Sequence, residues 1–496
     1  MKKILISTIA VSALLFNVSC DTEFDQDVSI IVVTKGDADF TKFISIGNSL
    51  TSGYRDGALY IDGQNESFPS MIAAQMQLAG GGAFKQPLMP NNTGGFVGLP
   101  GFPGKYTLTV SCGALSPGPT AAAAALDNVT AGGPYQNMGV PGAKSFHLGA
   151  PGYGSLAGLQ NGTANPYFVR FATSATASMI GDAVAQAPTF FSLWIGNNDV
   201  LSYATNGGIG VDRTGDTNPA NYGSNDITDP NVLAGVINGY VTALTANGAK
   251  GVIANIPNVT SIPYFTTVPS LPITNLTDAQ VSQLNTAYAP YNGGILQLKN
   301  AGVITDAEYQ SRIIKFTAGK VANGAVMLDK DLTNLTSINP ALRSYRQTTS
   351  KDLITLPASS VMKPYEATCS PNGISAGTAV PLEDKYVLSE KETGKVLTAT
   401  AAYNTAIKSI ATAKGLAFVD ANAKMIELSK SSGIMYDGVK YTATFVTGGT
   451  FSLDGVHLTG RGYALIANEF MKEINTKYRS TLPMVNVNNY SGVQFP

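Results

Sequence analysis

The feature that most constrains the fold of this chain is an alternation of short apolar runs with segments of helical periodicity. Apolar runs typical of buried strands lie at 43–46, 189–195, 251–256 and 416–420. Segments typical of helices lie at 69–78, 175–186, 232–246, 396–411, 421–428 and 463–474. Strands that alternate with helices pair in parallel and carry helices on both faces, so the pattern predicts an α/β fold around a parallel sheet.

Two long segments break this alternation, and we interpret them as loop-rich insertions. The first, at about 57–135, is rich in Gly, Pro, Asn and Ala, and the second, at about 260–388, contains a helical piece at 278–288. The chain has 496 residues, of which 44% are hydrophobic and 13% are charged, which is enough apolar material for a large core. We expect one interrupted domain over 41–480 and a C-terminal tail at 481–496.

The N-terminal segment predicts export. Two lysines precede an apolar run at 4–16, which is too short to span a bilayer and is typical of a signal peptide. Residues 1–19 resemble a bacterial lipoprotein signal that is cut before Cys20, although Asn17 departs from the usual leucine-like residue. The acidic tether at 20–40 resembles that of surface lipoproteins in Bacteroidetes-type bacteria.

This resemblance implies that the mature protein is anchored to the outer membrane by a lipid on Cys20, on its periplasmic or cell-surface face. The alternative is an ordinary signal-peptidase site in which Cys20 has no role. The other two cysteines, Cys112 and Cys369, predict one disulfide in an oxidising compartment or, equally well, two unrelated buried thiols.

Charge and histidine content exclude two classes of partner. The formal net charge is −1 and no basic run is present, so the sequence indicates no nucleic-acid partner. The chain contains two histidines and no cluster of Cys, His and carboxylates at metal-ligand spacing, so we expect no metal and no organic cofactor.

Four short polar segments supply the residue types of a nucleophilic site. They lie at 47–50 (GNSL), 139–142 (GVPG), 196–199 (GNND) and 454–457 (DGVH). Ser49 follows the first apolar run, and a serine on such a turn projects from the carboxyl edge of a parallel sheet. A neutral serine hydroxyl needs a base within hydrogen-bond reach, and that base needs a third group to orient it.

The two histidines, His147 and His457, are the candidates for this base. Asp454 precedes His457 by three residues, so both side chains emerge on one side of a helical turn. Asp454 would accept a hydrogen bond from one ring nitrogen, and the other nitrogen would take the proton of Ser49. His147 has no acid at a helpful spacing and is the weaker candidate; otherwise it is a loop residue or a pocket contact.

Three groups are candidate donors to an oxyanion that forms during attack by Ser49. They are the backbone N–H of Ser49, the backbone N–H of Gly142 and the side-chain amide of Asn198. Taken singly, each of these residues has an ordinary structural explanation as a turn or a helix cap. Four such segments in this order, each expected at the end of a strand, favour a hydrolytic site.

The four segments together resemble the conserved blocks of the SGNH hydrolases, also called GDSL esterases and lipases. The resemblance implies a flavodoxin-like, three-layer fold with a parallel sheet. It implies a triad of Ser49, Asp454 and His457, and an oxyanion hole formed by Ser49, Gly142 and Asn198. Asn48 stands where the family usually has an aspartate.

The family implies an esterase that forms an acyl-serine intermediate, and we expect lipid or fatty-acyl esters to be its preferred substrates. Apolar residues of the first insertion would line an acyl groove or would simply form the core of that insertion; they are Phe96, Val97, Leu99, Phe102, Tyr106, Leu108 and Val110. The alternatives are a polysaccharide O-acetyl esterase and a surface-binding lipoprotein that keeps the fold without catalysis.

Overall fold

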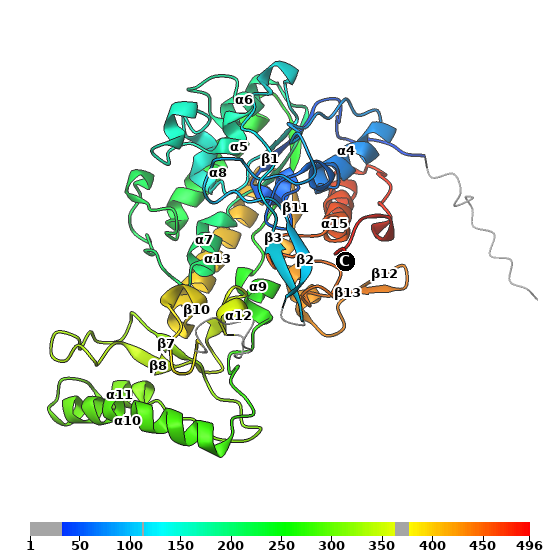
Figure 1. Ribbon diagram of the computed structural model, residues 1–496. Helices are drawn as coiled ribbons and strands as arrows, with labels where there is room; N and C mark the ends of the chain where they lie inside the picture. Colours follow the sequence, from blue (N-terminus) through cyan, green and yellow to red (C-terminus); the bar gives the residue numbers. More distant parts are fainter. Residues whose placement is uncertain (1–31, 112–113, 363–375) are drawn as a thin grey trace, which may run out of the picture.

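One central sheet organises the computed structural model, which describes residues 32–111, 114–362 and 376–496 (Figure 1). Its five strands all pair in parallel, in the order β11-β6-β5-β1-β4. They are β1 (Phe43–Gly47), β4 (Asn137–Gly139), β5 (Phe190–Trp194), β6 (Lys250–Ala254) and β11 (Ala417–Val419). Numbered along the chain and read from β4, this is the 2-1-3-4-5 order of flavodoxin-like folds, so the expected fold is confirmed.

The apolar runs that predicted strands each contain one. β1 and β5 are buried along their whole length, as expected for central strands of a parallel sheet that is covered on both faces. No apolar run indicated β4, because its three residues are too few to show a periodic signal; only the GVPG segment pointed to the end of a strand there. It nevertheless forms the edge next to β1 and carries the GVPG segment at its carboxyl end.

Helices cover both faces of the sheet and make three layers. α4 packs against α15, whereas α8 packs against α6 and α13, and Figure 1 shows these two groups on opposite sides of the sheet. The helices of the layers are α4 (Phe68–Leu78), α15 (Gly460–Tyr478), α6 (Met179–Ala185), α8 (Pro230–Thr245) and α13 (Glu390–Ala413). α4 lies inside the first predicted insertion, yet it is part of a layer.

Side-chain caps explain where several of these helices begin. Asp229 accepts hydrogen bonds from two backbone N–H groups in the first turn of α8, and Ser389 forms a reciprocal capping box with Glu392 at the start of α13. Ser178 caps α6, which therefore begins later than the predicted position 175. These polar caps satisfy N–H groups that a helix leaves unpaired at its first turn.

The remaining elements lie at the edges of the sheet or in the insertions. The first insertion also contains α3 (Ile61–Asn65), β2 (Tyr106–Ser111) and β3 (Ala114–Pro119). The second insertion contains α9 (Pro263–Thr266), α10 (Asp278–Asn300), α11 (Asp306–Arg312), β7 (Val326–Leu328), β8 (Tyr345–Gln347), β9 (Leu353–Ile354), α12 (Ala358–Val361) and β10 (Val387–Leu388). Short elements elsewhere are α2 (Ser49–Ser52), α5 (Pro166–Val169), α7 (Asn198–Thr205), α14 (Ala421–Ser429), β12 (Ile434–Tyr436) and β13 (Val439–Tyr441).

The second insertion has an apolar core separate from that of the sheet. Figure 1 shows α10, α11, β7 and β8 as a lobe set apart from the sheet. Aromatic and aliphatic side chains of this lobe pack on one another, among them Tyr288, Tyr291, Ile295, Phe316 and Leu342. The helix predicted at 278–288 is confirmed, but it continues to Asn300. The limits of the domain and of its insertions stay predictions.

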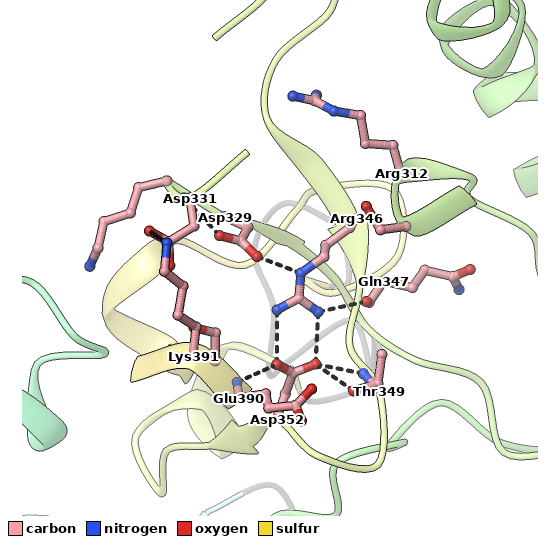
Figure 2. Close-up of polar contacts among 12 residues, drawn as sticks. Arg312, Asp329, Asp331, Arg346, Gln347, Thr349, Asp352, Glu390 and Lys391 are labelled. Carbon is pink, nitrogen blue, oxygen red and sulfur yellow. Dashed lines mark hydrogen bonds and ion pairs between the residues drawn. The ribbon is translucent and has the colours of Figure 1, made fainter. Parts of the chain in front are cut away.

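A buried ion-pair network joins this insertion to α13 (Figure 2). The Arg346 guanidinium donates to both carboxylate oxygens of Asp352, at 2.7 and 2.8 Å, and to Asp329 Oδ2 at 2.5 Å. Asp352 Oδ1 also accepts from the backbone N–H of Glu390, the first residue of α13, at 3.1 Å. Burial alone would raise the pKa of Asp352, but Arg346 and the hydrogen bonds to the carboxylate lower it.

Replacing Arg346 with leucine should destabilise the protein, because two buried carboxylates then lose their partner. Removing one member of a buried pair typically costs about 3–5 kcal/mol, and denaturant unfolding followed by circular dichroism measures it. The control is Lys351→Ala, which breaks the exposed Lys351–Glu390 pair and should leave the midpoint unchanged. Equal midpoints for both variants would contradict a structural role of the Arg346 network.

Several predictions fall on residues outside the described ranges. Cys20, Cys112 and Cys369 all lie there, as does most of the predicted signal and tether, so the lipid anchor and the disulfide stay predictions. Among the residues that the structure does describe, no helix combines the length and the apolarity needed to cross a bilayer.

Candidate active site

The turn that carries Ser49 follows directly from β1. Asn48 lies before α2 and its side chain accepts a hydrogen bond from the Leu50 N–H at 3.1 Å, so that Ser49 becomes the first helical residue. Gly47 is required at the end of the strand, because a Cβ there would lie 2.2 Å from Thr51 Oγ1. The serine hydroxyl therefore leaves the sheet at its carboxyl edge, where the sequence predicted it.

A hydrogen-bonded line joins the three residues of the expected triad. His457 Nε2 lies 2.9 Å from Ser49 Oγ, and His457 Nδ1 lies 2.7 Å from Asp454 Oδ2. The side chains of His457 and Asp454 are 14% and 11% exposed, so the imidazole can still be reached from solvent. In this arrangement Nδ1 donates to the carboxylate and Nε2 is free to accept the serine proton.

Asp454 is held by a dense set of donors. Its Oδ1 accepts from the backbone N–H groups of Val456 and His457, at 2.9 and 2.8 Å, and from Ser452 Oγ at 3.1 Å. Its Oδ2 accepts from the Gly57 N–H at 2.9 Å besides the imidazole. Burial alone would raise the pKa of Asp454, but His457 and these hydrogen bonds lower it far below its ordinary value, so the acid stays ionised.

The oxyanion candidates stand at the ends of three neighbouring strands. Gly47 of β1 is in register with Gly139 of β4 and with Trp194 of β5, so the turns after these strands leave the sheet at one level. Ser49 lies on the first of these turns, Gly142 follows β4 and Asn198 begins α7 after β5. The register thus makes the turns that carry Ser49, Gly142 and Asn198 begin at one level of this edge.

Local geometry leaves all three of these donors suited to bind an anion. Gly142 has φ of +81°, and a Cβ built there meets no atom closer than Asn165 Nδ2 at 3.8 Å, so a substrate can approach its backbone. Asn198 Nδ2 donates to Ala143 O at 2.9 Å, which orients the amide while its second hydrogen remains to be donated. The Ser49 N–H lies in the first turn of α2, where it has no intrahelical acceptor.

The side chain of Asn48 joins two of the turns at the edge of the sheet. Asn48 Nδ2 donates to Asn197 Oδ1 at 3.2 Å, and this bond joins the turn after β1 to the turn after β5. An ionised aspartate has no hydrogen to donate there. Asn48 therefore has a matching acceptor on the neighbouring turn.

His147 is placed away from this line. It lies in a 3₁₀ helix (Ser145–Gly149), its Nδ1 accepts from the Lys144 N–H at 3.1 Å, and its ring stacks on Tyr153 at 4.6 Å. Within the described part of the chain no hydrogen bond connects it to Ser49 or to an acid. Burial, together with the charge of Lys144, lowers the pKa of His147 to about 4. This histidine therefore has a packing role, and His457 is the base candidate.

Sequence reasoning missed Tyr54 and Gly57, which support the triad from the segment just after the serine helix. The ring of Tyr54 packs against the imidazole of His457 with 4.7 Å between ring centroids, and Tyr463 Oη donates to Tyr54 O at 2.6 Å. Gly57 contributes the N–H that binds Asp454. The only available signal was position, because both residues closely follow the serine segment.

The apolar wall expected in the first insertion does not form as one surface. Phe96 is buried and packs on Phe102 and Tyr167, whereas Val97 and Val110 are exposed. Phe96 belongs to the main apolar core, with Leu99 and Phe102 packed against it, whereas the exposed valines fit neither an acyl groove nor a core. Among the described residues no group of His, Cys, Asp and Glu side chains has the arrangement of a metal site.

Comparison with known proteins adds little. No protein-family model and no curated protein matches the sequence. Among solved structures, a mutant of an acetyl-xylooligosaccharide esterase from Geobacillus stearothermophilus is 10% identical with a TM-score of 0.31, over 88% of this chain and 96% of that chain. A catalytic mutant of an acetylxylan esterase from that species has the same identity and TM-score, over 89% and 97%. Likeness this low carries no argument about activity.

The two histidines should differ sharply in their effect on Ser49. His457→Gln should slow covalent labelling of Ser49 by a fluorophosphonate about 10²–10⁴-fold, the usual contribution of a general base. His147→Gln should leave the labelling rate unchanged, because its ring makes no contact with the serine. Peptide mapping locates the label and a time course gives the rate; similar losses in both variants would contradict the assignment of His457.

Proposed function

We propose that the protein is a serine hydrolase of carboxylic esters that works through an acyl-serine intermediate. The single observation that carries this proposal is the line of hydrogen bonds from Ser49 Oγ through the His457 imidazole to the Asp454 carboxylate. Nucleophilic acyl transfer requires a hydroxyl, an imidazole that accepts its proton, and a carboxylate that stays ionised. The low pKa of Asp454 keeps this carboxylate ionised.

The geometry supports a two-step reaction. His457 Nε2 takes the proton of Ser49 as Oγ attacks the ester carbonyl, and the oxyanion is stabilised by Ser49, Gly142 and Asn198. The imidazolium then gives its proton to the leaving alcohol, and the acyl group stays on Oγ. Water, deprotonated by His457, next releases the acid and restores the serine. Losing one oxyanion donor typically costs about 2.7–4 kcal/mol of barrier.

As preferred substrates we propose lipid or fatty-acyl esters. What supports this is a mainly apolar pocket of about 100 Å³ whose wall includes chain neighbours of the triad residues. Leu50 and Val456, the chain neighbours of Ser49 and His457, form part of its wall. The rest of the wall is mainly apolar and includes Trp194, Ile262, Ala421, Met425, Leu428 and Leu465, together with the paired side chains of Lys424 and Glu469. Such a wall favours an alkyl chain over a sugar.

The place of action that we propose is a membrane surface, with Cys20 as the lipid-bearing residue. This part rests on the sequence of the N-terminal segment alone. It accords with a preference for lipid esters, because an anchored enzyme meets its substrate in the plane of the membrane.

A series of nitrophenyl esters of increasing acyl length tests the substrate. If the chain enters the pocket, kcat/KM should rise about fourfold for each methylene until the pocket is full, since burying one methylene gives about 0.8 kcal/mol. Ser49→Ala is the control and should remove the rate at every length. A maximum at acetyl indicates a polysaccharide O-acetyl esterase, and the absence of any serine-dependent rate indicates a binding protein.

Filling the pocket should change this length dependence selectively. Ala421→Leu adds bulk at the wall in α14, so rates on long acyl chains should fall while the rate on acetyl esters stays the same. The matched control is Ala423→Leu on the same helix, where the side chain is exposed. The pocket is not the acyl site if Ala421→Leu and Ala423→Leu show the same length profile in steady-state assays.

A further inference from the structure

The segment after the serine helix binds the loop that carries the catalytic acid. The Asp56 N–H donates to Ser452 Oγ at 2.9 Å, and Asp56 Oδ1 accepts from the Leu453 N–H at 3.0 Å. The next residue, Gly57, donates its N–H to Asp454 Oδ2 at 2.9 Å. Three consecutive residues of the acid loop are thus each held by a pair of residues nearly 400 positions earlier in the chain.

Asp56 is itself held in an unusual conformation. Its φ of +54° lies in the left-handed region, which a residue with a Cβ enters only where its surroundings stabilise it. Its Oδ2 accepts from Tyr60 Oη at 2.6 Å, and Tyr60 Oη in turn accepts from Arg55 Nε at 2.7 Å. Arg55 is anchored by Glu66 at 2.6 Å. These contacts with Tyr60 and Arg55 orient the carboxylate of Asp56, which also binds the acid loop.

Burial and the nearby charge of Asp454 both disfavour the ionised form of the Asp56 carboxylate. Burial raises the pKa of Asp56, the negative charge of Asp454 raises it further, and the hydrogen bonds from Tyr60 and Leu453 and the charge of Arg55 oppose the change. Two carboxylates that approach each other in a buried place repel, and an apolar loop contact would avoid this repulsion. Asp56 is nevertheless the acceptor that fixes the Leu453 N–H, directly before the acid.

We propose that Asp56 is a positioning residue, which holds the loop at 452–454 so that Asp454 stays aligned with His457 Nδ1. The expected loss of kcat rests on the esterase function proposed above, whereas the positioning of Asp454 does not. Asp56 contacts none of the reacting atoms; it acts through the loop backbone, while Gly57 adds a donor to the oxygen that the imidazole uses. Displacing a catalytic group by about 1 Å can reduce a rate about 10²-fold.

Asp56→Ala is the kinetic test. The expected result is a fall in kcat of about 10²-fold on nitrophenyl acetate with little change in KM, because the acid loop shifts and this short acyl group does not depend on the pocket that Val456 lines. Asp56→Asn keeps an acceptor for the Leu453 N–H and should recover part of kcat. The matched control is Asp62→Ala, six residues later, whose carboxylate pairs with Asn92 instead of the acid loop; it should behave as wild type.

A second measurement does not depend on catalysis. The chain has two histidines, so nitrogen-15 labelling of histidine gives a spectrum of two rings in which His147 is the internal reference. The downfield proton on His457 Nδ1, which reports the bond to Asp454, should move upfield in Asp56→Ala and Asp56→Asn and stay in place in Asp62→Ala.

The two measurements separate the two claims. An inactive wild-type protein with the expected change in the Nδ1 proton overturns the esterase function and keeps the positioning role. An active wild-type protein with unchanged kcat and an unchanged Nδ1 proton in Asp56→Ala overturns the positioning role alone. If Asp56→Ala does not fold, the same comparison is made with Asp56→Asn, and an unchanged proton and kcat there overturn the proposal.

Discussion

The hydrogen-bond register of β1 with its two neighbours is the constraint on which the site depends. Gly47 pairs with Gly139 on one side and with Trp194 on the other, so three turns leave the sheet at the same height. Parallel strands end at one edge, and this is why a hydroxyl, a glycine N–H and an amide from distant segments converge. The bond between Asn48 and Asn197 then ties two of these turns directly together.

The acid and the base reach this edge by a different route. Asp454 and His457 come from the loop before α15, which lies on one face of the sheet and starts with the Thr459 cap. A loop has no strand register to set its height, so its position depends on side-chain and backbone contacts. Gly455 O accepts from the Tyr264 N–H of the second insertion at 2.9 Å, and the first insertion holds the other side through Gly57.

The parts of the fold and of the site that could be predicted are those whose sequence pattern lies within a few neighbouring residues. The strand before Ser49 and the Asp454–His457 pair show themselves within a few residues, and the structure places them as the sequence indicated. β4 is too short to show a period, although the GVPG segment after it was recognised. The contact of Asp56 with Leu453 joins residues that no periodicity relates, and the same holds for Tyr54 over His457.

Contacts from outside the sheet fix the position of the loop that carries Asp454. A triad set on a strand edge and a free loop would sample many separations of Asp454 from the imidazole, and each rigid contact removes some of them at the cost of ordering the chain. The segment after the serine helix supplies Asp56 as an acceptor, and Gly57, at the start of the first insertion, is a donor. The second insertion supplies the Tyr264 contact and is itself fixed to α13 through Arg346 and Asp352. The alignment of Asp454 with His457 therefore depends on contacts outside the sheet as much as on the sheet itself.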